Sequence, residues 1–257
     1  MPNIIKTIEL KNGIWQLAEC DADGNDFVDA YLVCGNERAV LIDALCTVTG
    51  LYECVRKLTG LPLDVVMTHG HIDHVGASTP EFFNTCGVYI DARDIFLTDA
   101  LSGADGVKEL SDGQVFELGG KRLEVISVPG HTPGSVVLLD RENEIIFTGD
   151  TVGSGSFWMQ LPESLPLAAF DKNLDRLCEI VATYGGLTVY VGHRSQGSPT
   201  MTGTYIEDVS AATKRILDGT LTGIPSVMRL GETELKMCAA EHGTMKNYCY
   251  DPLKIYE

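Results

Sequence analysis

The sequence predicts an α+β fold in which two β-sheets face each other and helices cover their outer sides. Strand-like runs occur in both halves of the chain, and two pairs of them are joined by short turns. Amphipathic helical patterns follow strand-like runs, most clearly in the second half. The chain has 257 residues, 44% of them hydrophobic, with no linker, repeat or low-complexity segment. We therefore expect a single domain over residues 1–257, with residues 219–257 as a C-terminal tail packed on it.

Two turn dipeptides mark the predicted hairpins. β-branched runs flank Gly35-Asn36 within residues 31–43, and similar runs flank Gly119-Gly120 within residues 115–128. Short apolar runs predict further strands at residues 64–67, 136–139, 144–147 and 188–191.

Helical spacing is clearest in residues 167–184, where apolar side chains recur every three or four positions. A second helix is predicted over residues 204–218, with Thr204 and Glu207 at the spacing of a capping box. Weaker helical patterns cover residues 47–58 and 93–101.

Residues 155–166 form the longest predicted loop. This segment carries Phe157, Trp158 and Met159, which is unusual for a plain connection at the surface. We therefore expect the segment to fold over a pocket as a lid whose apolar side chains contact a substrate.

Charge and cysteine usage limit the partners and the compartment. Nineteen basic and 36 acidic residues give a formal charge of −17, which repels polyphosphates, so no nucleic-acid partner is expected. No apolar run is long enough to cross a bilayer, and the eight scattered cysteines include no C-x-x-C pair. We expect a soluble cytoplasmic protein with reduced thiols and no membrane partner, and the sequence leaves open whether it forms a homo-oligomer.

Four motifs each come directly after a strand-like run, and each contains side chains of the kinds that bind metals. They read T-H-G-H-I-D-H at residues 68–74, P-G-H-T-P-G at 129–134, T-G-D-T at 148–151 and G-H at 192–193. Five of the six histidines lie in these motifs, and imidazole suits zinc, iron and similar ions. Loops at strand ends converge readily on one point, so the motifs predict a metal site.

The first motif has the spacing to serve two ions. His69 and His71 are two residues apart and face one metal from an extended segment, whereas Asp73 and His74 turn toward a second. A lone histidine is usually a hydrogen-bonded core residue, but chance assembly of this H-x-H-x-D-H cluster is rare.

Together the four motifs resemble those of metallo-β-lactamase-fold hydrolases, over about residues 25 to 195 and in the same order, in the glyoxalase II and lactonase-like branch. The resemblance implies a four-layer αββα sandwich. It also implies one metal on His69, His71 and His131, a second on Asp73, His74 and His193, and Asp150 as a bridge. Asp43, at the end of the first hairpin, is expected to support the ligands from behind.

The function expected from this site is hydrolysis by a hydroxide that bridges two divalent ions. Zinc is the first choice of metal, with iron and manganese as alternatives. Asp73 and Asp150 are the candidate catalytic residues, because either carboxylate is placed to steer a proton toward the leaving group. An ester, a lactone, a thioester or a related acyl compound fits as the small-molecule substrate. A mononuclear iron oxidoreductase similar to persulfide dioxygenases remains the alternative.

Differences between these motifs and those of individual branches of the family limit the substrates that we expect. The commonest true β-lactamases carry cysteine at the position of Asp150, and flavodiiron proteins carry glutamate at that of His71. No Lys or Arg lies between Asp150 and Lys172, which speaks against a glutathione conjugate because its carboxylates lack partners. The predicted substrate pocket therefore comprises Phe157, Trp158, Met159 and Arg194, the last being the cation nearest to the motifs. The roles of His242, Tyr248 and Tyr250 in the tail stay open, with a structural role preferred.

Overall fold

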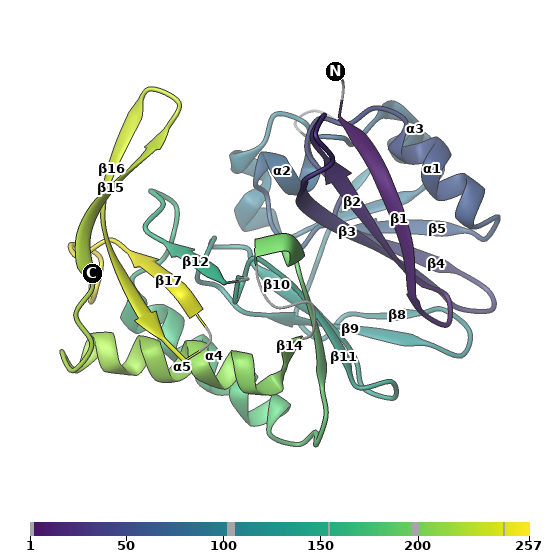
Figure 1. The fold of residues 1–257 in the computed structure, drawn as a ribbon. Coiled ribbons are helices and arrows are strands. Elements are labelled where there is room, and N and C mark those ends of the chain that lie inside the picture. Colours follow the sequence, from purple (N-terminus) through teal and green to yellow (C-terminus); the bar gives the residue numbers. More distant parts are fainter. Residues whose placement is uncertain (1–2, 102–105, 154, 197–200, 244) are drawn as a thin grey trace.

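The computed structural model of the chain describes residues 3–101, 106–153, 155–196, 201–243 and 245–257. Two large sheets pack face to face, and helices lie outside both of them (Figure 1). In spatial order the first sheet holds β1(Ile4–Lys11), β2(Ile14–Cys20), β3(Asp26–Cys34), β4(Ala39–Ile42), β5(Leu63–Val66), β6(Gly87–Ile90) and β7(Val107–Glu109). The second holds β14(Met201–Thr202), β13(Thr188–Val191), β11(Ile145–Gly149), β10(Val136–Asp140), β9(Arg122–Ser127) and β8(Val115–Glu117).

The central strands are apolar at successive positions because both of their faces are buried. In β4, Val40 and Ile42 join the core between the two sheets, whereas Ala39 and Leu41 join the core beneath the helices of the first sheet. Both predicted hairpins are present, as β3 with β4 and as β8 with β9. The predicted αββα sandwich is therefore confirmed.

The helices cover the outer face of each sheet. On the first sheet lie α1(Leu51–Leu58), α2(Ile72–Val75), α3(Pro80–Thr85) and the short 3₁₀ helix η1(Ala92–Leu97). On the second lie α4(Leu167–Val181) and α5(Gly203–Leu217), with the 3₁₀ turn η2(Arg194–Gln196) after β13.

Helix ends depart from the sequence-based prediction. The helix α5 begins at Gly203 with Thr202 as its N-cap, and no side chain caps it. The predicted capping box of Thr204 and Glu207 is therefore wrong. The helix predicted in residues 93–101 is the six-residue η1, which is too short to show apolar periodicity.

The segment predicted as a loop, residues 155–166, begins with a strand, and this corrects the prediction of a lid. Strand β12(Ser156–Met159) pairs in parallel with β17(Met245–Tyr250) from the C-terminal tail. The tail adds β15(Ile224–Leu230) and β16(Thr233–His242), which gives a third sheet in the order β12-β17-β16-β15. The hairpin of β15 and β16 forms the end of this sheet away from β12, with β17 between them (Figure 1).

The tail packs on the second half of the molecule. Tyr248 is fully buried and its hydroxyl lies 2.7 Å from Thr213 Oγ1 in α5, while the Tyr250 hydroxyl accepts a bond from the amide of Gly223. His242 accepts a bond from exposed Arg215. Tyr248 and Tyr250 thus have structural roles. Among the described residues, no helix is long and apolar enough to span a membrane.

Candidate metal centre

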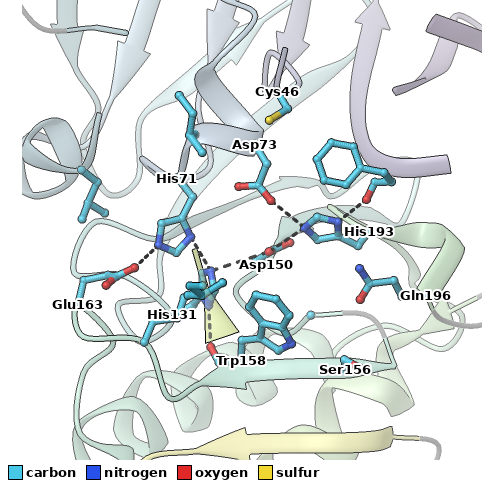
Figure 2. A pocket seen from close by; sticks show the side chains of 16 residues that line it. Cys46, His71, Asp73, His131, Asp150, Ser156, Trp158, Glu163, His193 and Gln196 are labelled. Atoms are coloured by element: carbon cyan, nitrogen blue, oxygen red, sulfur yellow. Dashed lines mark hydrogen bonds and ion pairs between the residues drawn. The ribbon is translucent and has the colours of Figure 1, made fainter. Parts of the chain in front are cut away.

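The seven predicted ligands come together at the carboxyl ends of the strands. Five of them line a cavity of about 580 Å³ (Figure 2), namely His71, Asp73, His131, Asp150 and His193. His69 and His71 follow β5, Asp73 and His74 lie in α2, and the other three follow β9, β11 and β13. They form three overlapping groups, in each of which the potential ligand atoms lie within 4.8 Å of one another. The groups are His69, His71 and His131; His69, His74 and Asp150; and Asp73, His74 and His193.

In the first group the ring nitrogens turned inward are acceptors. His131 Nδ1 lies 2.7 Å from the carbonyl oxygen of Trp158, which can only accept, so Nδ1 carries the proton. His71 Nε2 lies 2.5 Å from Glu163 Oε1 and donates to it. The remaining nitrogens, His71 Nδ1 and His131 Nε2, then face each other at 3.0 Å with a lone pair each. Two lone pairs at that distance repel unless a cation lies beside both, so this pair is suited to a metal ion.

The group of Asp73, His74 and His193, hereafter the second group, is also held from behind. His74 Nδ1 lies 2.8 Å from Asp43 Oδ2, and His193 Nδ1 donates to the carbonyl oxygen of Phe27 over 2.6 Å. His193 Nε2 therefore faces inward, 3.4 Å from Asp73 Oδ2 and 3.2 Å from Asp150 Oδ2.

Asp150 lies between the two groups. Its Oδ2 is 3.9 Å from His131 Nε2 in the first group, and its Oδ1 is 3.5 Å from His74 Nε2 in the second. A carboxylate in this position is placed to contact two ions at once, as the resemblance implies for Asp150.

Three buried polar atoms at the centre have no hydrogen-bond partner among the described residues: His69 Nε2, His74 Nε2 and Asp150 Oδ1. A buried polar atom without a partner costs free energy, so natural proteins rarely retain one without a ligand or water. Imidazole nitrogens and carboxylate oxygens are also the donors that zinc, iron and manganese accept. The residues therefore fit two divalent cations.

The electrostatics differ between the two groups. Burial lowers the pKa of His131 to about 4, with the nearby His71 adding to the effect, so this imidazole is in the neutral form that binds metal. Burial also opposes a charge on His193, but Asp150 and Asp73 outweigh it and raise its pKa well above the usual range. Burial would raise the pKa of Asp73, yet its bond with His193 lowers it to about 2.

Asp43 supports the ligands from behind, as expected. Its carboxylate accepts bonds from the amide and the hydroxyl of Thr68, at 2.7 and 2.8 Å, besides its contact with His74. The backbone of Asp43 has φ of 63°, a left-handed conformation that is costly outside glycine. Such a strained position next to a site is typical of residues held for function.

Asp94 is a supporting residue that the sequence analysis missed. It is fully buried and accepts bonds from the amides of Gly70 and Gly134 and from the hydroxyl of Thr132. It therefore ties the loop of His69 and His71 to the loop of His131. A Cβ atom at Gly70 would come within 2.4 Å of the Asp94 carbonyl oxygen, so glycine is required for this approach.

Glu163 is the second missed residue. Glu163 lines the cavity, and its carboxylate accepts a hydrogen bond from Nε2 of His71 (Figure 2). Burial raises the pKa of the Glu163 carboxyl, but the bond from His71 outweighs burial and leaves the pKa below its usual value. The signal was present, because Glu163 is the one charged residue in the apolar segment 155–166.

The predicted pocket residues do not all reach the cavity. Trp158 lines it, but Phe157 and Met159 are buried in the core on the opposite face of β12, because successive strand residues point to opposite sides. Arg194 is not among the lining residues: its guanidinium donates to Gln16 and its amide to Asp29. The placement of Phe157, Met159 and Arg194 in the pocket is therefore wrong.

The cavity instead has an apolar wall that the sequence analysis did not predict. The wall comprises Phe27, Ile72, Leu97, Trp158, Leu161 and Leu230. Among the described residues that line the cavity there is no Lys or Arg.

Comparisons with known proteins agree with this geometry. The sequence model of the metallo-beta-lactamase superfamily matches residues 23–193. An acyl-coenzyme A thioesterase MBLAC2 from Gallus gallus is 27% identical over 208 residues, which cover 67% of this chain and 74% of that protein. A hydroxyacylglutathione hydrolase from Brucella anthropi is 32% identical over 166 residues, which cover 63% of this chain and 59% of that protein. A solved metallo-beta-lactamase from Pontibacter korlensis has the same fold, with a TM-score of 0.65 at 20% identity, covering 82% of this chain and 99% of that one.

Proposed function

Since the chain belongs to the metallo-beta-lactamase superfamily, we propose that it is a metal-dependent hydrolase that cleaves acyl esters, lactones or thioesters with two divalent ions. The observation that carries the proposal is the convergence of two ligand groups on either side of Asp150, where three buried polar atoms have no hydrogen-bond partner among the described residues.

Among the described residues that line the cavity, no thiol is activated as a nucleophile. Cys46 is the one thiol among the described lining residues, and burial, together with the charge of Asp73, raises its pKa to about 11. A neutral thiol is a poor nucleophile at physiological pH. Water is therefore the proposed nucleophile.

Metal ions bound at these residues would lower the pKa of a bound water and polarise a substrate carbonyl. His69, His71 and His131 would hold one ion, Asp73, His74 and His193 would hold a second, and Asp150, which faces both groups, would contribute its carboxylate. Asp73 faces the cavity with 27% of its side chain exposed, so it is placed to pass a proton to the leaving group.

The relatives support acyl chemistry over the alternative. The two relatives described above are named as an acyl-coenzyme A thioesterase and a hydroxyacylglutathione hydrolase, which favours hydrolysis over an iron dioxygenase. A glutathione substrate is not proposed, because no described cavity residue offers a cation to its carboxylates.

Metal content and a substrate panel test the proposal together. Untagged protein prepared without added metal should contain close to two transition-metal ions per chain by elemental analysis. It should also hydrolyse at least one of an aryl ester, a lactone and an acyl thioester, with activity lost in chelator and restored by zinc. One iron ion per chain and no hydrolysis would instead support the dioxygenase.

A further inference from the structure

The wall of the cavity includes a residue from outside the matched family region. Leu230 lines the cavity from the end of β15, whereas the superfamily match ends at residue 193. The C-terminal hairpin therefore adds to the site a side chain that the shared fold does not supply.

The hairpin turns one face toward the cavity. Residues 228 and 230 point to the same side of β15, since side chains alternate along a strand. Met228 is held to the body of the protein, because its sulfur accepts a bond of 3.4 Å from Gln160, which is itself only 2% exposed. Gln160 directly precedes Leu161, another residue of the apolar wall. Leu230, which is part of the apolar wall, thus lies on the face of β15 that Met228 anchors to the body of the protein.

Several large apolar side chains of the wall are exposed to solvent at the cavity. Ile72 is 56% exposed, Leu230 42% and Phe27 38%. Exposed apolar side chains gathered at a cavity are typical of a ligand site. Asp73, Asp150 and Glu163 line the same cavity, so it presents carboxylates as well as apolar side chains.

We propose that the apolar wall binds the alkyl chain of an acyl substrate and that Leu230 determines the preferred chain length. This inference rests on the proposed hydrolase function and specifies its substrate class. Each methylene buried against the wall should raise kcat/KM about fourfold, until the chain fills the cavity.

A series of p-nitrophenyl esters tests chain length. With butyrate, hexanoate, octanoate and decanoate esters, kcat/KM of the parent protein should rise with length. Leu230→Asp should reduce kcat/KM about tenfold for the octanoate ester and much less for the butyrate ester, because the new carboxylate is hydrated beside the chain and a longer chain loses more contact. Val227→Asp is the matched control, since Val227 lies on the same strand, is 54% exposed and does not line the cavity.

A binding measurement separates this inference from the proposed function. In a Trp15→Phe background, Trp158 is the only tryptophan and reports on the cavity. Its emission should respond to 1-octanol at much lower concentration than to 1-butanol, and Leu230→Asp should weaken the response. If octanol binds and no ester, lactone or thioester is cleaved, the hydrolase proposal fails while the apolar wall stands as a binding site for an alkyl chain. If esters are cleaved at rates independent of chain length and of Leu230, this inference is overturned while the hydrolase proposal stands.

Discussion

The histidines of the candidate site are oriented by the atoms behind them. Asp43, Glu163 and two backbone carbonyls each contact the outer ring nitrogen of one histidine, which turns the inner nitrogen of that ring toward the other candidate ligands. Partners of this kind fix the ring and the tautomer, and their removal usually weakens metal binding. The seven ligands were predictable because they share short motifs with fixed spacing, whereas Asp94 and Glu163 are far from those motifs in sequence and no spacing points to them.

Replacing Asp150 with Asn should remove the negative charge that faces both ligand groups. We expect the metal content to fall from two ions toward one and kcat/KM to decrease by more than about a hundredfold. The fold should persist, since Asp150 lies just beyond the end of β11. His242→Ala, which changes a side chain outside the cavity lining, is the control and should keep near-normal metal content and turnover. Full activity in Asp150→Asn would contradict the assignment of this residue.

Glu163→Gln should keep the size of the side chain and its ability to accept from His71, while removing its charge. Metal affinity, measured by competition with a chromogenic chelator, should drop about tenfold to a hundredfold. Glu117→Gln is a suitable control, because Glu117 pairs with Arg122 on an exposed strand. Unchanged affinity in Glu163→Gln would show that the contact with His71 only fills space.

At the scale of elements, local pattern identified strands and helices wherever the partners are close in sequence. The hairpins around Gly35 and Gly119 are examples, because turn and strand signals lie together. Strand β12 was missed because four residues carry little periodicity and its partner β17 lies in the C-terminal tail. For the same reason Phe157 and Met159 were wrongly predicted to line the pocket. The side chains of a loop have no fixed alternation, whereas those of a strand point to opposite sides in turn.

Because side chains alternate in direction along β12, substitutions of Phe157 and of its neighbour Trp158 should have different effects. Phe157 is fully buried and contacts Phe170 and Tyr248, so Phe157→Ala should lower the free energy of unfolding by about 3–5 kcal/mol in urea titrations. Trp158→Ala should cost less stability and instead raise KM, because Trp158 lines the cavity. The reverse pattern would mean that β12 has the opposite register.

At the scale of the whole molecule, the site joins the two halves of the sandwich. His69, His71, Asp73 and His74 follow the first sheet, whereas His131, Asp150 and His193 follow the second. Ions bound between them cross-link the two sheets. A ligand that binds only the folded chain stabilises it by about 4 kcal/mol at a thousandfold excess over its Kd, which corresponds to roughly 10 °C in Tm for a chain of this size.

The gain in Tm on adding metal should itself depend on pH. In the chelated protein the pKa values of His74 and His193 are raised well above the usual range, because nearby carboxylates outweigh burial. The pKa of Asp73 is lowered to about 2, since its bond with His193 outweighs burial. The stability from the raised histidines is full below their unfolded pKa of about 6.5 and is lost as pH rises through the folded values. The stability from Asp73 is present above its unfolded pKa of about 3.9 and is lost only as pH falls toward 2.

At pH 5 both contributions are therefore present without metal, and protons on the histidines take the place of the ions between the two sheets. Metal must displace these protons to bind, which weakens its affinity in acid. We expect the difference in Tm between zinc-loaded and chelated protein to be small at pH 5 and to widen steadily toward pH 8, as measured by calorimetry at constant ionic strength. The Asp150→Asn variant should show a smaller difference at pH 8, since it lacks the charge that attracts both the protons and the ions. A difference in Tm that stays constant from pH 5 to pH 8, or is largest at pH 5, would show that histidine protons and metal do not compete for the same atoms.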